Sequence, residues 1–151
     1  MKHNIIILDM DSTLSDVRHR VHFLHQTPKD WSGWNAGAKD DSPNVPIIQT
    51  VLALYNAYRS RTQFVVFSGR IESLRDDTTS WMRKHLGPEF ANDVTLYLRE
   101  DGDRTPDHIL KERWLKQLSL PVLLAIDDRS SVVTMYRSHG ICTLQCADGD
   151  Y

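Results

Sequence analysis

The sequence predicts an α/β fold: a Rossmann-like three-layer sandwich with a central parallel sheet of about five strands, helices on both faces and a small or minimal cap. Two observations predict it. Short apolar runs rich in β-branched residues recur along the 151 residues, and amphipathic stretches at helical spacing separate them. Such runs suit strands buried on both faces, and their alternation with helices favours parallel strands joined by right-handed crossovers. The length suits one domain, which we expect to span residues 1–151.

The expected elements follow the apolar pattern in chain order. Pro46 stands at a favourable first helical position, and Gly87-Pro88 is a helix stop signal. Thr105-Pro106 opens a helix that we expect to reach Leu118. The expected strands are residues 5–8, 64–67, 94–98, 122–126 and, with a weaker pattern, 141–144. The expected helices lie around residues 47–58, 81–86, 105–118 and 132–136.

Residues 15–45 form the one stretch without a clear period. We expect a long loop or a small cap here, inserted between the first strand and the first core helix. A loop of this length inside a compact domain is usually functional, although a packed surface excursion is the alternative. Trp31 and Trp34 in this segment could stack on a base or simply pack, and packing is the commoner outcome.

The composition excludes several classes of protein. A formal net charge of −2 provides no global basic field of the kind that drives tight non-specific binding to duplex DNA, although a local patch stays open. Cys142 and Cys146 are too few for a disulfide framework, and we expect buried thiols. No apolar run approaches the ~18 residues of a membrane span, and no cleavage site follows the short apolar start. We therefore expect a cytoplasmic protein with no membrane partner.

Carboxylates directly follow two of the expected strands. Asp9 and Asp11 follow the first and, being two apart on extended backbone, point to the same side. Asp127 and Asp128 follow the fourth. Since ligands of open α/β sheets bind beyond the carboxyl ends of the strands, these carboxylates converge if the two strands are neighbours. A turn or N-cap explains one such Asp but not two pairs, and the cluster predicts a cation, for which hard oxygen ligands favour Mg²⁺.

A third polar element follows the second expected strand. Ser68 and Gly69 can present a hydroxyl and backbone N–H groups to a phosphate oxygen, and Arg70 could bind the same substrate bidentately. Alone, these three residues are better explained as a plain turn. Lys111 likewise gains meaning only from the set, because a surface lysine on a helix is the default.

Taken together, these residues resemble the motifs of the haloacid dehalogenase superfamily of phosphatases. Their order and their strand-end placement agree with that family from residue 5 to about residue 149. The positions that match its four motifs are Asp9, Asp11 and Thr13 for the first, Ser68 for the second, Lys111 for the third, and Asp127 with Asp128 for the fourth.

The resemblance implies a mechanism. Asp9 would attack phosphorus and form an aspartyl-phosphate, while Asp11 would protonate the leaving hydroxyl and then activate water. Ser68, the Gly69 N–H and Lys111 would hold the phosphoryl oxygens, and Thr13 would fix the loop. Arg70 and Arg99 are candidates for contacts beyond the phosphate. The implied Mg²⁺ ligands are Asp9, the main-chain carbonyl of Asp11, Asp127 and Asp128.

Two further segments resemble the phosphatase half of phage-type polynucleotide kinase-phosphatases. They are residues 99–103, which lead to Asp107 and Lys111, and residues 125–137. Ser12 stands where that family often has glycine. No Gly-x-x-x-x-Gly-Lys-Ser/Thr loop occurs, so we expect the kinase half to be absent. For a phage-encoded protein the expected location is the host cytoplasm.

The resemblance favours a 3′-phosphatase that acts on DNA or RNA ends, because a small cap leaves the site open to a large substrate. The alternative is a 3′- or 5′-nucleotidase acting on free mononucleotides, which the acidic net charge favours mildly. A non-catalytic binding module on the same fold is a third possibility, although no motif acid is lost. The expected partners are a nucleic-acid 3′-phosphate end or a nucleotide, and possible ones are a separate kinase or ligase.

Overall fold

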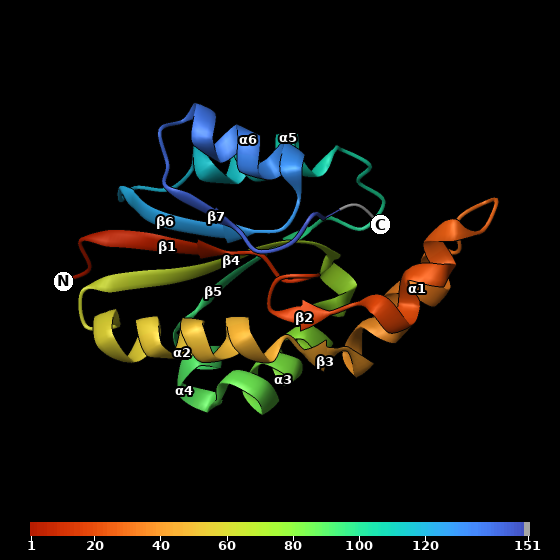
Figure 1. Ribbon diagram of the computed structural model, residues 1–151, viewed down its shortest axis with the longest axis horizontal. Helices are drawn as coiled ribbons and strands as arrows, with labels where there is room; N and C mark the ends of the chain where they lie inside the picture. The colour runs from red at the N-terminus through yellow and green to blue at the C-terminus, as the bar shows by residue number, and fades with distance from the viewer. Residues whose placement is uncertain (150–151) are drawn as a thin grey trace.

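A parallel sheet forms the centre of the computed structural model, which describes residues 1–149 (Figure 1). The strand order is β5-β4-β1-β6-β7, and every neighbouring pair is parallel. All five apolar runs of the sequence form these strands, so the predicted α/β fold is confirmed. The strands are β1 (Asn4–Leu8), β4 (Thr62–Ile71), β5 (Thr95–Arg99), β6 (Val122–Asp127) and β7 (Thr143–Gln145).

Helices cover both faces of the sheet (Figure 1). One layer contains α2 (Val45–Tyr58), α3 (Arg75–Leu86) and α4 (Pro88–Asp93), and the other contains α5 (Asp107–Leu115) and α6 (Ser130–Ser138). The alternation of side chains along β1 divides the core accordingly. Ile6 and Leu8 pack with α2, α3 and α4, whereas Ile5 and Ile7 pack with α5 and α6.

Three details differ from the sequence prediction. Helix α5 ends at Leu115, and Leu118 packs against the core from the segment beyond it. The short helix α4 directly after Gly87 was not expected. Strand β4 does not end at Phe67 but runs on to Ile71, which pairs with Arg99 after an irregularity in the register. Pairing with β5 therefore extends β4 beyond the end of its apolar run.

Residues 15–43, which we call the cap, lie beyond the carboxyl ends of the strands (Figure 1). Two-residue strands, β2 (Ser15–Asp16) and β3 (Ser42–Pro43), pair antiparallel at its base. Between them lie the 3-10 helix η1 (Arg18–His25), the helix α1 (Trp31–Gly37) and the 3-10 helix η2 (Ala38–Asp40). A small apolar cluster of Val17, Leu24 and Trp34 holds the cap together. Most of this segment is thus helical, although it shows no period in the sequence.

Two expectations from composition can be compared with the structure. Both cysteines are free thiols, but Cys142 is exposed and Cys146 is only half-buried, so the prediction of buried thiols was wrong. Cys142 lies just before the edge strand β7, where less of the chain covers it. Within residues 1–149, no helix combines the length and the apolar character that crossing a membrane requires.

Candidate active site

Three aspartates meet where β1 and β6 end side by side. Leu8 pairs with Ile126, so the residues that follow them, Asp9 and Asp127, leave the sheet at the same level. Carboxylate oxygens of Asp9, Asp127 and Asp128 lie within 4.8 Å of one another, and all three residues are buried. We call these three residues and Lys111 the strand-end cluster.

Lys111 supplies the positive charge of the strand-end cluster. Its neighbours on α5, Leu110 and Trp114, pack into the core beneath the helix, and this packing fixes the depth of the helix. The buried Lys111 ammonium donates hydrogen bonds to Asp9 Oδ1 at 2.6 Å and to Asp127 Oδ2 at 2.7 Å. Two of the three buried carboxylates are therefore paired with the one ammonium of the cluster, and Asp128 is not.

Burial and crowding change the proton affinities in this cluster. Burial raises the pKa of Asp9 well above its usual value, and the negative charges of Asp127 and Asp128 add to that rise. Burial also raises the pKa of Asp128. Burial alone would lower the pKa of Lys111, but Asp127 and Asp9 outweigh it and keep the ammonium charged. The cluster lacks positive charge, and a cation would supply it.

Thr13 and an unsatisfied oxygen show where a cation fits. The Thr13 hydroxyl lies 3.1 Å from Asp9 Oδ2 and 3.3 Å from Asp128 Oδ1, and its single hydrogen serves one of them at a time. Asp128 Oδ2 is buried without a hydrogen-bond partner among the described residues. An orphaned carboxylate oxygen beside two other carboxylates is a donor set that suits a hard divalent cation.

Asp11, two residues after Asp9, has a different environment. Its Oδ1 accepts hydrogen bonds from Arg20 Nη2 and Arg70 Nε, both at 2.9 Å. Burial raises the pKa of Asp11, but the guanidinium groups of Arg70 and Arg20 outweigh it, and the net pKa lies below the usual value. Ser12 between the two aspartates has a φ of +62°, in the left-handed region that favours glycine.

Asp41 completes a second cluster, which joins the cap to the sheet. Asp41 Oδ1 and Oδ2 accept from Arg20 Nε and Nη2 at 2.7 Å, and Oδ2 also accepts from Arg70 Nη2 at 2.8 Å. The Arg20 guanidinium lies 3.8 Å from the centre of the Trp34 ring. We call Asp11, Asp41, Arg20 and Arg70 the arginine cluster. Both arginines are buried, and two guanidinium groups face two carboxylates.

The remaining predicted site residues lie next to these clusters. Ser68 is buried, and its Oγ accepts the Arg70 N–H at 3.2 Å. A Cβ at Gly69 would lie 3.0 Å from Asp107 Oδ1, so the close approach of α5 favours glycine there. Arg99 donates to the carbonyls of Gly69 and Thr105 and to Asp107. The guanidinium groups of Arg70 and Arg99 are thus bound to protein oxygens, and their contact with substrate stays a prediction.

Sequence reasoning missed Asp41 and the buried ion pair that it forms with Arg20. Arg20 and Asp41 lie in the segment without a period, where a buried ion pair between residues 21 apart leaves no local pattern. The tryptophans divide into two groups: Trp34 and Trp81 are buried, as expected for packing, whereas 56% of Trp31 is exposed.

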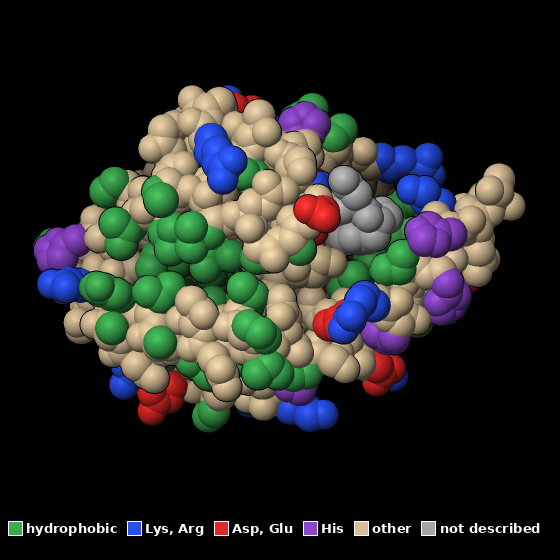
Figure 2. All heavy atoms as spheres, in the orientation of Figure 1, with side chains coloured by type: hydrophobic (Ala, Val, Ile, Leu, Met, Phe, Trp, Pro, Cys, Tyr) green, Lys and Arg blue, Asp and Glu red, His purple; other side chains and the backbone are tan. Residues whose placement is uncertain are grey.

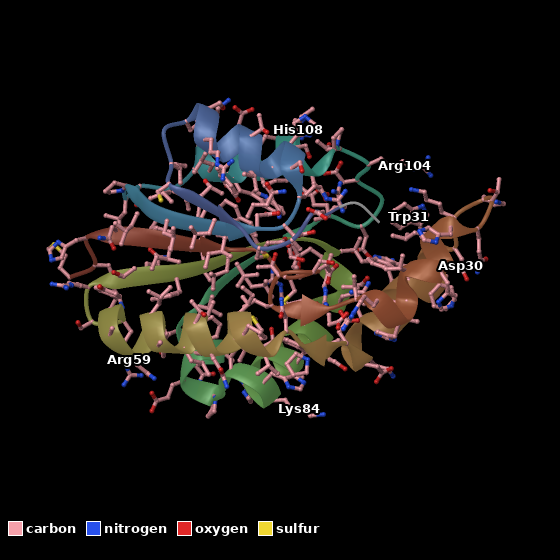
Figure 3. All side chains as sticks on the ribbon, in the orientation of Figure 1. Asp30, Trp31, Arg59, Lys84, Arg104 and His108 are labelled. Carbon is pink, nitrogen blue, oxygen red and sulfur yellow. The ribbon has the colours of Figure 1, made fainter. Side chains whose placement is uncertain are left out.

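A cavity of about 930 Å³ opens over the strand-end cluster. Its inner wall includes Asp9, Lys111, Asp127 and Asp128. Its outer walls come from the cap and from the loop before α5, where Figure 3 labels Trp31 and Arg104. The acidic cluster is therefore accessible from outside, although its side chains are buried.

The strand-end aspartate paired to a helical lysine, with two more aspartates at the end of the neighbouring strand, agrees with the motif pattern described in the sequence analysis. Fold and site together define a phosphatase of the haloacid dehalogenase superfamily. More narrowly, the chain belongs to the family described as the polynucleotide kinase PNKP phosphatase domain, whose family model matches residues 3–151.

Solved structures agree with this assignment. The chain is similar to chains of two Pnkp1/Rnl/Hen1 complexes, one of them described as an RNA repair complex, with TM-scores of 0.76 and 0.74 and identities of 25% and 26%. The similarity covers 99% of this chain in both cases but only 44% and 48% of the other two chains. This chain therefore spans less than half of each of them. A class C acid phosphatase from Bacillus anthracis with tungstate bound has the same fold, with a TM-score of 0.63 and 18% identity over all of this chain and 69% of that one.

Proposed function

We propose that this protein is a Mg²⁺-dependent phosphomonoesterase that removes the 3′-phosphate from nucleic-acid ends through an aspartyl-phosphate intermediate. The observation that carries the proposal is the strand-end cluster, in which a buried Asp9 lies against Lys111 at the floor of an open cavity. The family match and the similarity to chains of an RNA repair complex support the choice of a nucleic-acid substrate.

The residues present fit a magnesium ion. Asp9, Asp127 and Asp128 supply the carboxylates, and the main-chain carbonyl of Asp11 is the further ligand that we propose. The unpaired Asp128 Oδ2 is the oxygen that gains most from a cation. When bound, Mg²⁺ supplies neutralising charge to the carboxylates and to the phosphoryl oxygens.

Asp9 is the nucleophile in this proposal. Its carboxylate attacks phosphorus, the bond from phosphorus to the 3′-oxygen breaks, and the 3′-hydroxyl leaves with a proton. Lys111 holds Asp9 in place and stabilises the negative charge on the phosphoryl oxygens, together with Ser68 and the Gly69 N–H. Thr13, within hydrogen-bonding distance of Asp9 and Asp128, fixes the loop that presents them.

Asp11 is the general acid and base in this proposal, and its environment favours the ionised form from which it acts as a base. Its pKa is lowered by Arg70 and Arg20, so in the free protein it is ionised at neutral pH. An ionised Asp11 can accept a proton from the water that hydrolyses the aspartyl-phosphate. In the first step, Asp11 must carry the proton that the leaving oxygen takes. The arginine cluster therefore positions Asp11 and keeps it ionised, and the proton that Asp11 takes from water in the second step is the one that it gives to the leaving oxygen in the next turnover.

A free-mononucleotide phosphatase is the second candidate, favoured by the net charge of −2. The proposed setting is nucleic-acid repair in the cytoplasm, with a separate kinase or ligase supplying the other steps. The similarity to chains of an RNA repair complex supports such partners.

The experiment that tests the proposal compares substrates in the presence of Mg²⁺. Purified protein is given a 3′-phosphorylated oligonucleotide, the matched 5′-phosphorylated oligonucleotide, and free 3′- and 5′-mononucleotides, with an Asp9→Asn variant as control. Phosphate release mainly from the 3′-phosphorylated oligonucleotide, and none from the variant, is the expected result. A preference for mononucleotides would shift the assignment to a nucleotidase, and no release from any substrate would contradict both candidates.

A further inference from the structure

The outer half of the cavity plays no part in the chemistry described above. The cap contributes Pro28, Lys29 and Trp31 to this half, and the loop before α5 contributes residues 102–106. Figure 3 shows Trp31 on the cap and Arg104 on the loop that faces it. In Figure 2, Lys and Arg side chains gather at this end of the molecule, next to the cap.

Trp31 is the first observation that points to a ligand. More than half of its side chain is exposed, whereas Trp34, Trp81 and Trp114 are buried. Among residues 1–149, none of the other large apolar side chains that are exposed lines the cavity. An exposed indole in a cavity wall offers a flat face on which another ring can stack. Lys29 Nζ lies 5.7 Å from the centre of that ring and places a positive charge beside it.

Arg104 is the second observation. It is exposed and makes no hydrogen bond or ion pair with any residue from 1 to 149, unlike Arg70 and Arg99, which bind carboxylates of the protein. The carboxylate of the nearby Asp103 accepts hydrogen bonds from the backbone N–H and the hydroxyl of Thr105. The outer half therefore offers positive charge that forms no ion pair with a carboxylate of residues 1–149, while the inner half has an excess of negative charge.

The size of the cavity is the third observation. A volume of about 930 Å³ lies at the upper end of the range for sites that enclose a whole organic ligand, roughly 300–1,000 Å³. A phosphate group on the strand-end cluster would leave most of that volume empty. The empty part is the part lined by Trp31, Lys29 and Arg104.

We propose that the outer half of the cavity is a nucleotide-binding subsite, in which Trp31 stacks on a base upstream of the 3′-terminal phosphate and Arg104 and Lys29 bind an internucleotide phosphate. This inference rests on the proposed function and sharpens it, because it makes the substrate a single-stranded end of two or more nucleotides. A free mononucleotide has no internucleotide phosphate and fills the subsite incompletely.

The test is a length series of 3′-phosphorylated oligonucleotides of one to four nucleotides, in both RNA and DNA form, with Mg²⁺. For the unaltered protein, kcat/KM should rise by about tenfold or more from the mononucleotide to the trimer, since base–aromatic stacking contributes about 1–3 kcal/mol per base. A series in which kcat/KM does not change with length would overturn the subsite while leaving the phosphatase itself established. Absence of 3′-phosphate release from every length would overturn the proposed function as well.

Variants assign the length dependence to residues. In Trp31→Ala the ratio of kcat/KM for trimer to mononucleotide should fall toward one, and Trp31→Phe should restore most of it because phenylalanine keeps a stacking face. Arg104→Ala should lower the ratio and its dependence on salt concentration. Lys84→Ala, which removes an exposed charge on α3, should leave both unchanged. An unchanged ratio in Trp31→Ala would contradict the inference.

Binding can be measured without turnover. In the Asp9→Asn background, a 3′-phosphorylated trimer should quench the tryptophan fluorescence, because Trp31 is the exposed indole of the cavity. The quenching should be lost when Trp31→Phe is added. Equal quenching in both proteins would show that the trimer binds away from Trp31 and would overturn the proposal.

Discussion

Two charged clusters lie side by side at the carboxyl ends of the strands, and they differ in charge balance. In the strand-end cluster, three carboxylates are gathered around a single ammonium, that of Lys111, which pairs with Asp9 and Asp127. In the arginine cluster, Asp11 and Asp41 face the two guanidinium groups of Arg20 and Arg70. The pKa of Asp9 is raised in the first, while the pKa of Asp11 is lowered in the second. The pKa values of two aspartates in one motif are thus shifted in opposite directions.

The difference indicates what each cluster is for. A buried cluster with an excess of negative charge is stable only with protons or a cation, so it forms a binding site. A balanced cluster needs no ligand, and it ties the cap to the sheet while it holds Asp11 in one orientation. Nucleophilic attack and cation binding are therefore expected from the first cluster. The second is expected to stabilise the cap and to position Asp11 for proton transfer.

The largest effect is expected from Asp9→Asn, because the amide cannot attack phosphorus. Turnover should be abolished, but the stability of the folded protein should not decrease. Since burial and neighbouring carboxylates raise the pKa of folded Asp9, its ionisation disfavours folding at every pH above its unfolded-state pKa. At pH 7 in EDTA the variant should have a melting temperature at or above that of the unaltered protein. A clear drop would show that Asp9 stabilises the fold instead.

Asp11→Asn should reduce kcat by a factor of about 10²–10⁴, the usual contribution of general acid–base catalysis. The loss should persist across the pH range, because asparagine can neither give nor take a proton there. Steady-state phosphate release from the preferred substrate between pH 5 and 9 measures it. A rate within twofold of the unaltered protein would assign the proton transfers to another group.

Asp41→Asn should mainly lower stability. It leaves two buried guanidinium groups facing one carboxylate, and breaking a buried ion pair on one side costs about 3–5 kcal/mol. Urea denaturation measures the free energy of unfolding. The matched control is Asp40→Asn, since Asp40 is the exposed neighbour in η2 and its loss should change stability by less than about 0.5 kcal/mol. Equal effects of the two variants would contradict a balanced arginine cluster.

Mg²⁺ should stabilise the protein by a smaller amount. An ion that binds only the folded state adds about 2.7 kcal/mol to the free energy of unfolding at 100 times its Kd. The melting temperature should rise with Mg²⁺ and fall again with EDTA, and Asp127→Asn should remove most of the response. If Asp127→Asn and Asp41→Asn responded alike to Mg²⁺, the ion would not be bound at the strand-end cluster.

The sequence predicted the sheet and the three carboxylates of the strand-end cluster because both follow from local patterns. Asp9 and Asp127 stand directly after apolar runs, and parallel strands bring their ends together. The ion pair of Arg20 with Asp41 could not be predicted in this way, because it depends on the tertiary structure of the cap, in which the Arg20 guanidinium also packs on Trp34. Trp31 and Trp34 are three apart in one helix, and the structure alone distinguishes the exposed ring from the buried one.

The same limit explains why β4 was predicted to end too early. The apolar run stops at Phe67, whereas the strand continues through Ser68, Gly69 and Arg70 to Ile71. Those residues are held by contacts with distant segments, such as Arg70 with Asp11 and Asp41. Polar residues that are buried by long-range ion pairs carry no signal in a hydrophobicity pattern.

The measurement that tests the central claim most directly is acid quenching during turnover of an oligonucleotide that carries a radioactive 3′-phosphate. Labelled protein should accumulate in the presence of Mg²⁺, with the label on Asp9, and it should accumulate further in Asp11→Asn if that variant hydrolyses the intermediate more slowly. Active protein that releases phosphate while no label is found on Asp9, or while the label is on another residue, would contradict the assignment of Asp9 as the nucleophile.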